Sequence, residues 1–229
     1  MNVLLTNDDG ISAPGLQALE NAMQQLGWNY TIVAPATEQS QCGHRVTTHQ
    51  PLQVESRGEN RHAVHGTPAD CVRLALFALD VKPDLVLSGV NAGGNMGQDI
   101  VISGTVAAAR EAAYHGIRSM ALSHYMIREL KVDWQRTAAW MAEIVRETHA
   151  QEHPQKTFWN INLPHLAEDQ RELPPRTLCH PARSPLNVSY RKEAQGYAYS
   201  ASYASRPRDP GSDVEACFSG RVSVSLLHV

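Results

Sequence analysis

Two adjacent carboxylates, Asp8 and Asp9, stand near the start of the chain in the stretch TNDDG. Neighbouring side chains in a regular strand point to opposite faces of a sheet, but in a turn eased by Gly10 both carboxylates can face one ion. Without a cation, their mutual repulsion would keep one of them protonated. Together with hydroxyl and amide oxygens they would form an all-oxygen site, the kind that Mg²⁺ or Mn²⁺ prefers.

Two further polar segments carry oxygen atoms of this kind. Residues 35–40 end with Ser40, and residues 88–95 contain Asn91. Each of these segments, like Asp8 and Asp9, directly follows a short apolar run, and none of the three has histidines at the fixed short spacing that indicates zinc. Because Asp, Ser and Asn also favour turns and helix N-caps, a purely structural interpretation of each segment stays open beside the metal site.

The stretch Ser103-Gly104-Thr105 could bind a phosphate. It leads into an alanine-rich segment, residues 106–109, that is typical of a helix. The free N–H groups and the positive dipole end of a helix N-terminus favour an anion, and the two hydroxyls add donors. Ser103 or Thr105 could instead only cap the helix. A metal site beside an anion site would indicate phosphoryl chemistry.

The elements that must position these residues follow from alternating apolar runs and helical patterns. Strands are expected at residues 3–5, 30–34, 85–88, 120–123 and 158–163, a hairpin excursion at about 46–65, and helices at 16–26, from 67 onward, at 105–115 and at 134–149. Apolar strands that alternate with helices predict an α/β fold whose parallel sheet is covered on both faces. Because the carboxyl ends of parallel strands meet at one edge, the three polar segments should converge there.

The chain divides into two regions by composition. Residues 1–165 are expected to form the α/β core, and residues 166–229 a β-rich C-terminal region whose last strand returns to the core. The second region is rich in Pro and Arg, and apolar and polar residues alternate at 197–201 and 221–225.

Composition and charge exclude several classes of protein. With 229 residues, 42% of them hydrophobic, the chain can bury a sizeable core. A formal net charge of −3 gives no reason to expect a nucleic-acid polymer or an anionic membrane as a partner. No window approaches the ~20 apolar residues that span a bilayer. The four cysteines are widely spaced and form no C-x-x-C pair, which favours a reducing compartment, the cytoplasm.

Five blocks of the sequence resemble the SurE family of survival-protein nucleotidases, in the family's order and spacing: LLTNDDGISAPG, VAPATEQS, HGTPADCVRLAL, PDLVLSGVNAGGN and SGTVAAAREA. The resemblance is close over residues 1–125. It implies a Rossmann-like, doubly wound, mostly parallel sheet with a β-rich C-terminal extension. It also implies one divalent metal ion per subunit, Mg or Mn, and the site residues that follow. The implied metal ligands are Asp8, Asp9, Ser40 and Asn91, and the implied phosphate contacts are Asn95, Ser103, Gly104 and Thr105.

The same resemblance implies an activity and an assembly. Family members hydrolyse nucleoside 5′- and 3′-monophosphates, some also short polyphosphate, and form homodimers or homotetramers through C-terminal segments. This chain departs from the family's pattern at four positions around the expected pocket: Ala36, Gln41, Gln98 and Ile102. The family usually has acidic residues at the first and third of these, a glycine at the second and often a tyrosine at the fourth. The departures therefore bear on substrate preference and rate more than on metal binding.

The expected chemistry is metal-assisted hydrolysis of a phosphomonoester. Asp8 would orient or deprotonate the attacking water while Asp9 helps to fix the metal, or Asp8 would itself be a covalent nucleophile. A non-catalytic nucleotide binder or a pseudoenzyme on the same scaffold is the alternative. A dinucleotide binder should carry G-x-G-x-x-G after its first strand, and the first loop here lacks the first two of those glycines.

Overall fold

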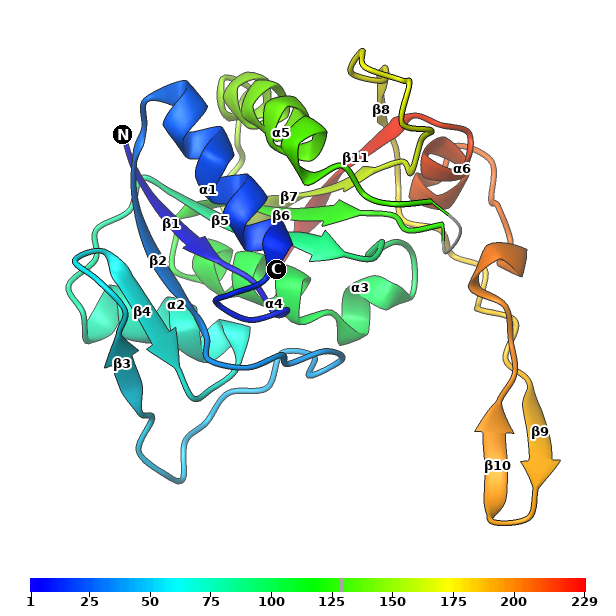
Figure 1. The fold of residues 1–229 in the computed structure, drawn as a ribbon, viewed down its shortest axis with the longest axis horizontal. Coiled ribbons are helices and arrows are strands. Elements are labelled where there is room, and N and C mark those ends of the chain that lie inside the picture. The colour runs from blue at the N-terminus through cyan, green and yellow to red at the C-terminus, as the bar shows by residue number, and fades with distance from the viewer. Residues whose placement is uncertain (128–129) are drawn as a thin grey trace.

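The computed structural model describes residues 1–127 and 130–229, which are built around a nine-stranded sheet of order β3-β4-β2-β1-β5-β6-β7-β11-β8 (Figure 1). Six neighbouring strands run parallel: β4 (Arg61–Val64), β2 (Asn29–Pro35), β1 (Asn2–Thr6), β5 (Leu85–Ala92), β6 (Arg118–His124) and β7 (Thr157–Leu163). β3 (Val54–Ser56) is antiparallel to β4, so the expected hairpin excursion widens the sheet. The predicted α/β fold with a mostly parallel sheet is confirmed.

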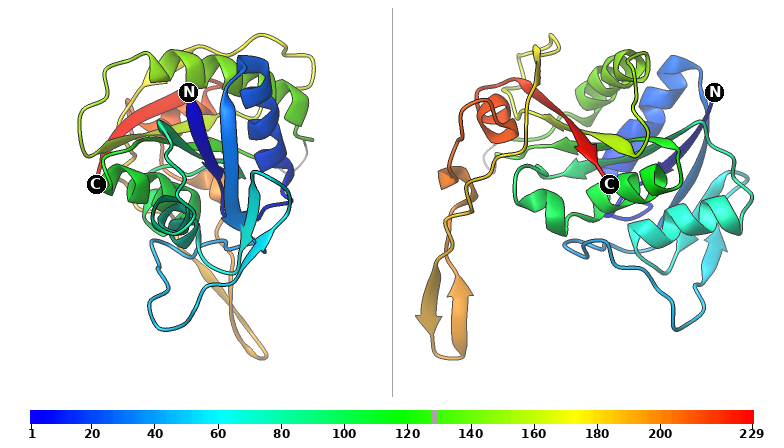
Figure 2. Two further views of the ribbon diagram at one scale, coloured as in Figure 1. Left: turned by 90° about the vertical axis from the view of Figure 1, so that its left-hand side faces the viewer. Right: turned by 180° about the vertical axis from the view of Figure 1, so that it is seen from behind.

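Helices cover both faces of this sheet (Figures 1 and 2). α1 (Pro14–Leu26) and α5 (Trp134–His149) pack together on one face, and α2 (Pro68–Phe77) and α4 (Gly104–Tyr114) pack on the other. The central strand β1 shows the division, because Val3 and Leu5 belong to the core beneath α1 and α5 whereas Leu4 packs with α2 and α4. Strands buried on both faces in this way read as continuous apolar runs, which is how the sequence reveals them.

Local sequence signals set the helix boundaries where they were expected. α1 ends at Gly27, whose φ of +65° is the left-handed conformation that glycine adopts without a steric cost. Thr67 caps α2 in a reciprocal box: its hydroxyl accepts the N–H of Asp70, and the Asp70 carboxylate accepts the N–H of Thr67. A cap of this kind stabilises a helix by about 1 kcal/mol.

The strand expected at residues 85–88 is longer than predicted. β5 continues to Ala92, so Asn91 lies within the strand and not in a loop after it. Ser88-Gly89 looks like a turn in the sequence, but Gly89 serves a close approach of two strands: its φ is +144°, and a Cβ there would lie 2.2 Å from the carbonyl oxygen of Leu122 in β6. Pairing with β6 resumes at Asn91 after an irregularity.

The C-terminal region both extends the sheet and projects from it. β11 (Val222–His228) pairs antiparallel with β7, and β8 (Arg176–Leu178) runs parallel to β11. β9 (Tyr190–Glu193) and β10 (Gly196–Tyr199) form an antiparallel hairpin, here called the arm, that stands away from the body (Figure 2). None of the helices in the described part of the chain is long and apolar enough to cross a membrane.

Three short helices are absent from the sequence prediction: α3 (Asp99–Ile102), the 3₁₀ helix η1 (Tyr203–Ser205) and α6 (Asp213–Phe218). Segments of three to six residues contain too few turns to show a helical period.

Candidate active site

The three polar segments converge at the carboxyl ends of β1, β2 and β5, as predicted. There they line one cleft of about 290 Å³. In the sheet, β1 lies between β2 and β5. The chain therefore passes from β1 to its neighbour on one side, β2, and later adds β5 as the neighbour on the other side. Such a switch in strand order is where open α/β sheets bind ligands. Six of the expected site residues line the cleft: Asp8, Asp9, Ser40, Asn91, Asn95 and Ser103.

Asp8 lies at the buried floor of this cleft, with only 5% of its surface exposed. The hydroxyl of Thr105, at the start of α4, donates to Oδ1 of Asp8 at 2.5 Å. Burial raises the pKa of Asp8 to about 6 against that hydrogen bond, and the neighbouring charge of Asp9 adds to the rise. A cation bound beside Asp8 would therefore stabilise the charged form of this carboxylate.

Gly104 allows α4 to approach Asp8 this closely. A Cβ at position 104 would lie 2.8 Å from Cβ of Asp8 and 3.0 Å from Sγ of Cys42. Neither Gly104 nor Thr105 lines the cleft, and Thr105 is fully buried. The Thr105 hydroxyl that the sequence offers as a phosphate donor is instead engaged with Asp8.

Asp9 follows Asp8 in the turn after β1 and contacts the neighbouring strand β5. Its Oδ2 accepts the N–H of Ala92 at the end of β5, at 3.1 Å, so this carboxylate ties the β1 turn to the neighbouring strand. The side-chain amide of Asn7 donates to the carbonyl oxygen of Gly10 at 2.8 Å and holds the turn closed. Burial raises the pKa of Asp9 against the hydrogen bond from Ala92, with a further contribution from the charge of Glu38.

Ser40 and Asn91 complete the oxygen set. The Ser40 hydroxyl donates to Glu38 at 2.5 Å, which leaves its oxygen lone pairs to accept or coordinate. The amide nitrogen of Asn91 donates to the carbonyl oxygen of Gly93 at 2.7 Å, which fixes the orientation of the carboxamide. Among the residues that the structure describes, no three His, Cys, Asp or Glu side chains lie close enough together to hold a metal. A metal held here depends on hydroxyl and amide oxygens beside the two carboxylates, a donor set that fits a hard divalent cation.

Asn95 is held by a buried polar network. Its N–H donates to Oδ1 of Asn162 at 2.7 Å and its side-chain amide donates to the Ser123 hydroxyl at 2.8 Å. Its carbonyl oxygen accepts from the side chains of Asn160 and Asn162. Ser103, which also lines the cleft, caps α4 by accepting the N–H of Val106 at 3.1 Å. Of the four residues expected to contact phosphate, Asn95 and Ser103 are thus the two that line the cleft, and both are fixed in place there.

Glu111 of α4 holds the loop that carries Ser40, because it binds His44 in that loop. This carboxylate is 2% exposed and binds His44 at 2.7 Å, Arg73 at 2.6 Å and His115 at 2.9 Å. Burial opposes its ionisation, but the hydrogen bonds from these partners outweigh burial and lower the pKa of Glu111 to about 2. Glu111 therefore joins the Ser40 loop to α2 and α4.

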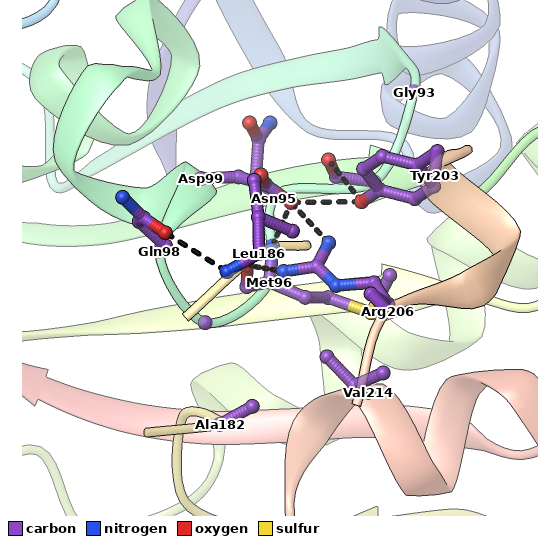
Figure 3. Close-up of polar contacts among 12 residues, drawn as sticks. Gly93, Asn95, Met96, Gln98, Asp99, Ala182, Leu186, Tyr203, Arg206 and Val214 are labelled. Atoms are coloured by element: carbon purple, nitrogen blue, oxygen red, sulfur yellow. Dashed lines mark hydrogen bonds and ion pairs between the residues drawn. The ribbon is translucent and has the colours of Figure 1, made fainter. Parts of the chain in front are cut away.

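Three polar residues of the cleft were not predicted from the sequence as site residues: Glu38, Asp99 and Tyr203. Tyr203 comes from η1 at the base of the arm, and its hydroxyl donates to Asp99 at 2.8 Å (Figure 3). A separation of 104 positions leaves no spacing pattern from which this contact could be inferred. Glu38 lies inside the expected second segment, where its proximity to Ser40 was a usable signal.

The four departures from the family pattern lie at or near the cleft. Gln41 and Ile102 line it, and Gln41 has a φ of +56°, a conformation that glycine would adopt without strain. Gln98 accepts the N–H of Leu186 at 3.2 Å, and Ala36 packs against the hydrophobic core.

The mostly parallel sheet, with a cleft of carboxylate, hydroxyl and amide oxygens at its switch point, defines an α/β protein with a candidate active site at that edge. Residues 3–184 match the model of the family described as survival protein SurE. Over 232 residues the chain is 37% identical to the 5′-nucleotidase SurE of Paramagnetospirillum magneticum, covering 99% of this chain and 89% of that one. It is 39% identical to the 5′-nucleotidase SurE of Geotalea daltonii, covering 100% of this chain and 93% of that one.

A solved structure agrees with these relatives. The crystal structure of the SurE protein from Aquifex aeolicus superposes with a TM-score of 0.86 at 33% identity, covering 100% of this chain and 93% of that one. The chain belongs to the SurE family, and it is an enzyme of the 5′-nucleotidase class.

Proposed function

We propose that this chain hydrolyses nucleoside 5′- and 3′-monophosphates to nucleoside and phosphate, with one divalent ion, Mg or Mn, per subunit. The observation that carries the proposal is the convergence of Asp8, Asp9, Ser40 and Asn91 in one cleft, with Asp8 buried at its floor. These four side chains would hold the ion. The reaction would take place in the cytoplasm, where the four free thiols of the chain stay reduced.

When bound, the divalent ion neutralises charge on the phosphoryl group and lowers the pKa of a coordinated water. Thr105 holds Oδ1 of Asp8, which leaves Oδ2 to orient the attacking water or to accept its proton. As the water oxygen bonds to phosphorus, the P–O ester bond would break, and the nucleoside oxygen would leave with the proton that the water gave up to Asp8. Asp9, tied to Ala92, keeps the β1 turn in place during this exchange.

Asn95 and Ser103 would hold the phosphoryl oxygens. Their positions are fixed before substrate binds, by the Asn160–Asn162 network on one side and by the N-terminus of α4 on the other. Donors set in advance stabilise a developing charge without a cost of reorganisation. Gly104 contributes by admitting α4 to the floor of the cleft.

The test is phosphate release from AMP and GMP with Mn²⁺ or Mg²⁺, compared with EDTA, for the wild type and Asp8→Asn. We expect release that depends on the metal and that the substitution lowers by ~100-fold or more. The control is Asp80→Asn, a carboxylate 84% exposed just before β5, at the opposite edge of the sheet, and it should retain wild-type activity. Absence of release with either metal from either nucleotide would overturn the proposal in favour of a nucleotide binder or a pseudoenzyme. Trapping an aspartyl-phosphate in a single turnover would make Asp8 the nucleophile.

We also propose that the chain forms a homodimer or homotetramer through its C-terminal region, residues 166–229. The arm carries Tyr190, Tyr197 and Tyr199, which are 62%, 71% and 56% exposed. An isolated two-stranded hairpin is marginally stable in water, so an arm that stands away from the body gains stability from a partner.

A further inference from the structure

We propose that the nucleoside part of the substrate binds in a groove beside the cleft, between residues 125–127 and residues 200–204 at the base of the arm. The groove encloses about 700 Å³, within the range of small-molecule sites, ~300–1,000 Å³. This inference rests on the proposed hydrolysis of nucleotides and adds to it a subsite that would distinguish nucleotides from smaller phosphomonoesters.

The groove is continuous with the phosphate end of the cleft. Gly94 and Tyr203 line both spaces. Gly94 keeps the passage between them open, because a Cβ there would lie 2.7 Å from Cε of Met96 and 3.3 Å from the hydroxyl of Tyr203. A phosphate held near Asn95 can therefore direct its ester substituent past Gly94 into the groove.

The shared wall is held rigidly. The Tyr203 hydroxyl donates to Asp99 at 2.8 Å and to the carbonyl oxygen of Gly94 at 3.3 Å (Figure 3). The guanidinium of Arg206 lies 4.7 Å from the centre of the Tyr203 ring, donates to Asp99 at 2.6 Å and donates to the carbonyl oxygen of Met96 at 2.9 Å. Arg206 is 5% exposed, so this clasp fixes the base of the arm against the turn that carries Asn95.

The chemistry of the groove suits a neutral, partly apolar ligand. Its apolar surface comes from Met126, Ile127, Ala201 and Ala204, and hydroxyls come from Ser200 and Ser202. None of the ten lining residues, all within the described part of the chain, is charged. A second phosphate would meet no cation among these ten residues, whereas the base and ribose of a nucleoside can combine apolar contact with hydrogen bonds to hydroxyls and backbone.

Calorimetric titration of the metal-loaded full-length protein with adenosine tests this subsite, because adenosine has no ester to hydrolyse. We expect saturable binding to the wild type and a dissociation constant at least tenfold higher in Ala201→Trp, whose indole would fill the groove. Ala150→Trp places the same side chain at an exposed position after α5 and should bind adenosine as the wild type does. Absence of saturable adenosine binding to the wild type, or equal affinity in Ala201→Trp, overturns the inference.

Kinetics separates this inference from the proposed function. The ratio of kcat/KM for AMP to kcat/KM for glycerol 2-phosphate, which is too small to fill the groove, should fall at least tenfold in Ala201→Trp. An unchanged ratio with metal-dependent hydrolysis of both substrates would remove the subsite and leave the nucleotidase intact. Adenosine binding that Ala201→Trp weakens, without any phosphate release, would keep the groove as a nucleoside site and remove the nucleotidase.

Discussion

Gly104 determines how closely α4 can approach Asp8, so a substitution at this position should change both the stability of the fold and the activity of the site. In Gly104→Ala the added Cβ would stand 2.8 Å from Cβ of Asp8 and would push the helix N-terminus outward. We expect a loss of 1–3 kcal/mol in the free energy of unfolding, about the cost of overpacking, and a fall in phosphate release of tenfold or more because Asp8 and Thr105 separate. Urea unfolding and initial rates measure the two effects.

The matched control is Gly116→Ala after α4. Gly116 has a φ of +77° and no heavy atom within 4 Å of an added Cβ. This substitution should cost about 1–2 kcal/mol through backbone strain alone and leave the rate unchanged. Equal rates for Gly104→Ala and the wild type would show that the close approach of α4 is not needed for catalysis.

Among the secondary-structure elements, α4 links the active site to the Ser40 loop through Glu111. The folded-state pKa of Glu111, about 2, is below its ordinary value of 4.5. Its contribution to stability is therefore present above pH 4.5 and is lost as the pH falls toward 2, by up to about 3 kcal/mol. We expect Glu111→Gln to be less stable than the wild type at pH 7, and the difference to shrink at pH 3, because at that pH the unfolded wild-type chain binds a proton that the folded carboxylate does not.

Urea unfolding of the wild type and Glu111→Gln at pH 7 and pH 3 measures this dependence. The side chains that bind the Glu111 carboxylate are His44 from the Ser40 loop, Arg73 from α2 and His115 from α4. Glu55→Gln is the control, because Glu55 binds His65 and Arg57 on the edge hairpin but is 42% exposed, and exposed ion pairs contribute 0–1 kcal/mol. A stability difference for Glu111→Gln that does not change with pH would contradict this account.

The same elements show what the sequence can predict. Asp8, Ser40 and Asn91 were predicted to converge because each follows an apolar run. The carboxyl ends of parallel strands lie at one edge of the sheet, and this holds for any conformation of the loops. The predicted end of β5 was too early because a Ser-Gly pair is compatible both with a turn and with a close approach of two strands. Only the position of Leu122 in β6 distinguishes the two.

The contribution of the arm base to the site was beyond sequence reasoning for another reason. Tyr203 reaches Asp99, and Arg206 reaches both Asp99 and Met96, across more than 100 positions. A lone tyrosine and a lone arginine in an irregular region have no periodicity, and what they contact depends on how residues 166–229 return to the sheet.

For the molecule as a whole, the cleft and the arm are connected through Tyr203, which lines the cleft and lies at the base of the arm. The clasp of Tyr203, Asp99 and Arg206 sits where the arm leaves the body, beside the turn that carries Asn95 (Figure 3). If the arm contacts a second copy of the chain, as we propose, that contact restrains the base of the arm and with it one wall of the nucleoside groove. Assembly would then favour the binding-competent arrangement without contributing any residue to the reaction itself.

Replacing the three exposed arm tyrosines by serine, Tyr190→Ser, Tyr197→Ser and Tyr199→Ser together, tests the role of the arm in assembly. The substitutions remove the apolar surface of the arm and leave Tyr203 and Arg206 untouched, so the mass measured by sedimentation should fall from that of an oligomer toward that of one chain. Because released arms no longer restrain the groove wall, adenosine should bind more weakly while hydrolysis of glycerol 2-phosphate persists. An unchanged mass would place the contact between copies elsewhere on the molecule, and a monomer with wild-type adenosine affinity would show that the clasp holds the groove without help from a partner.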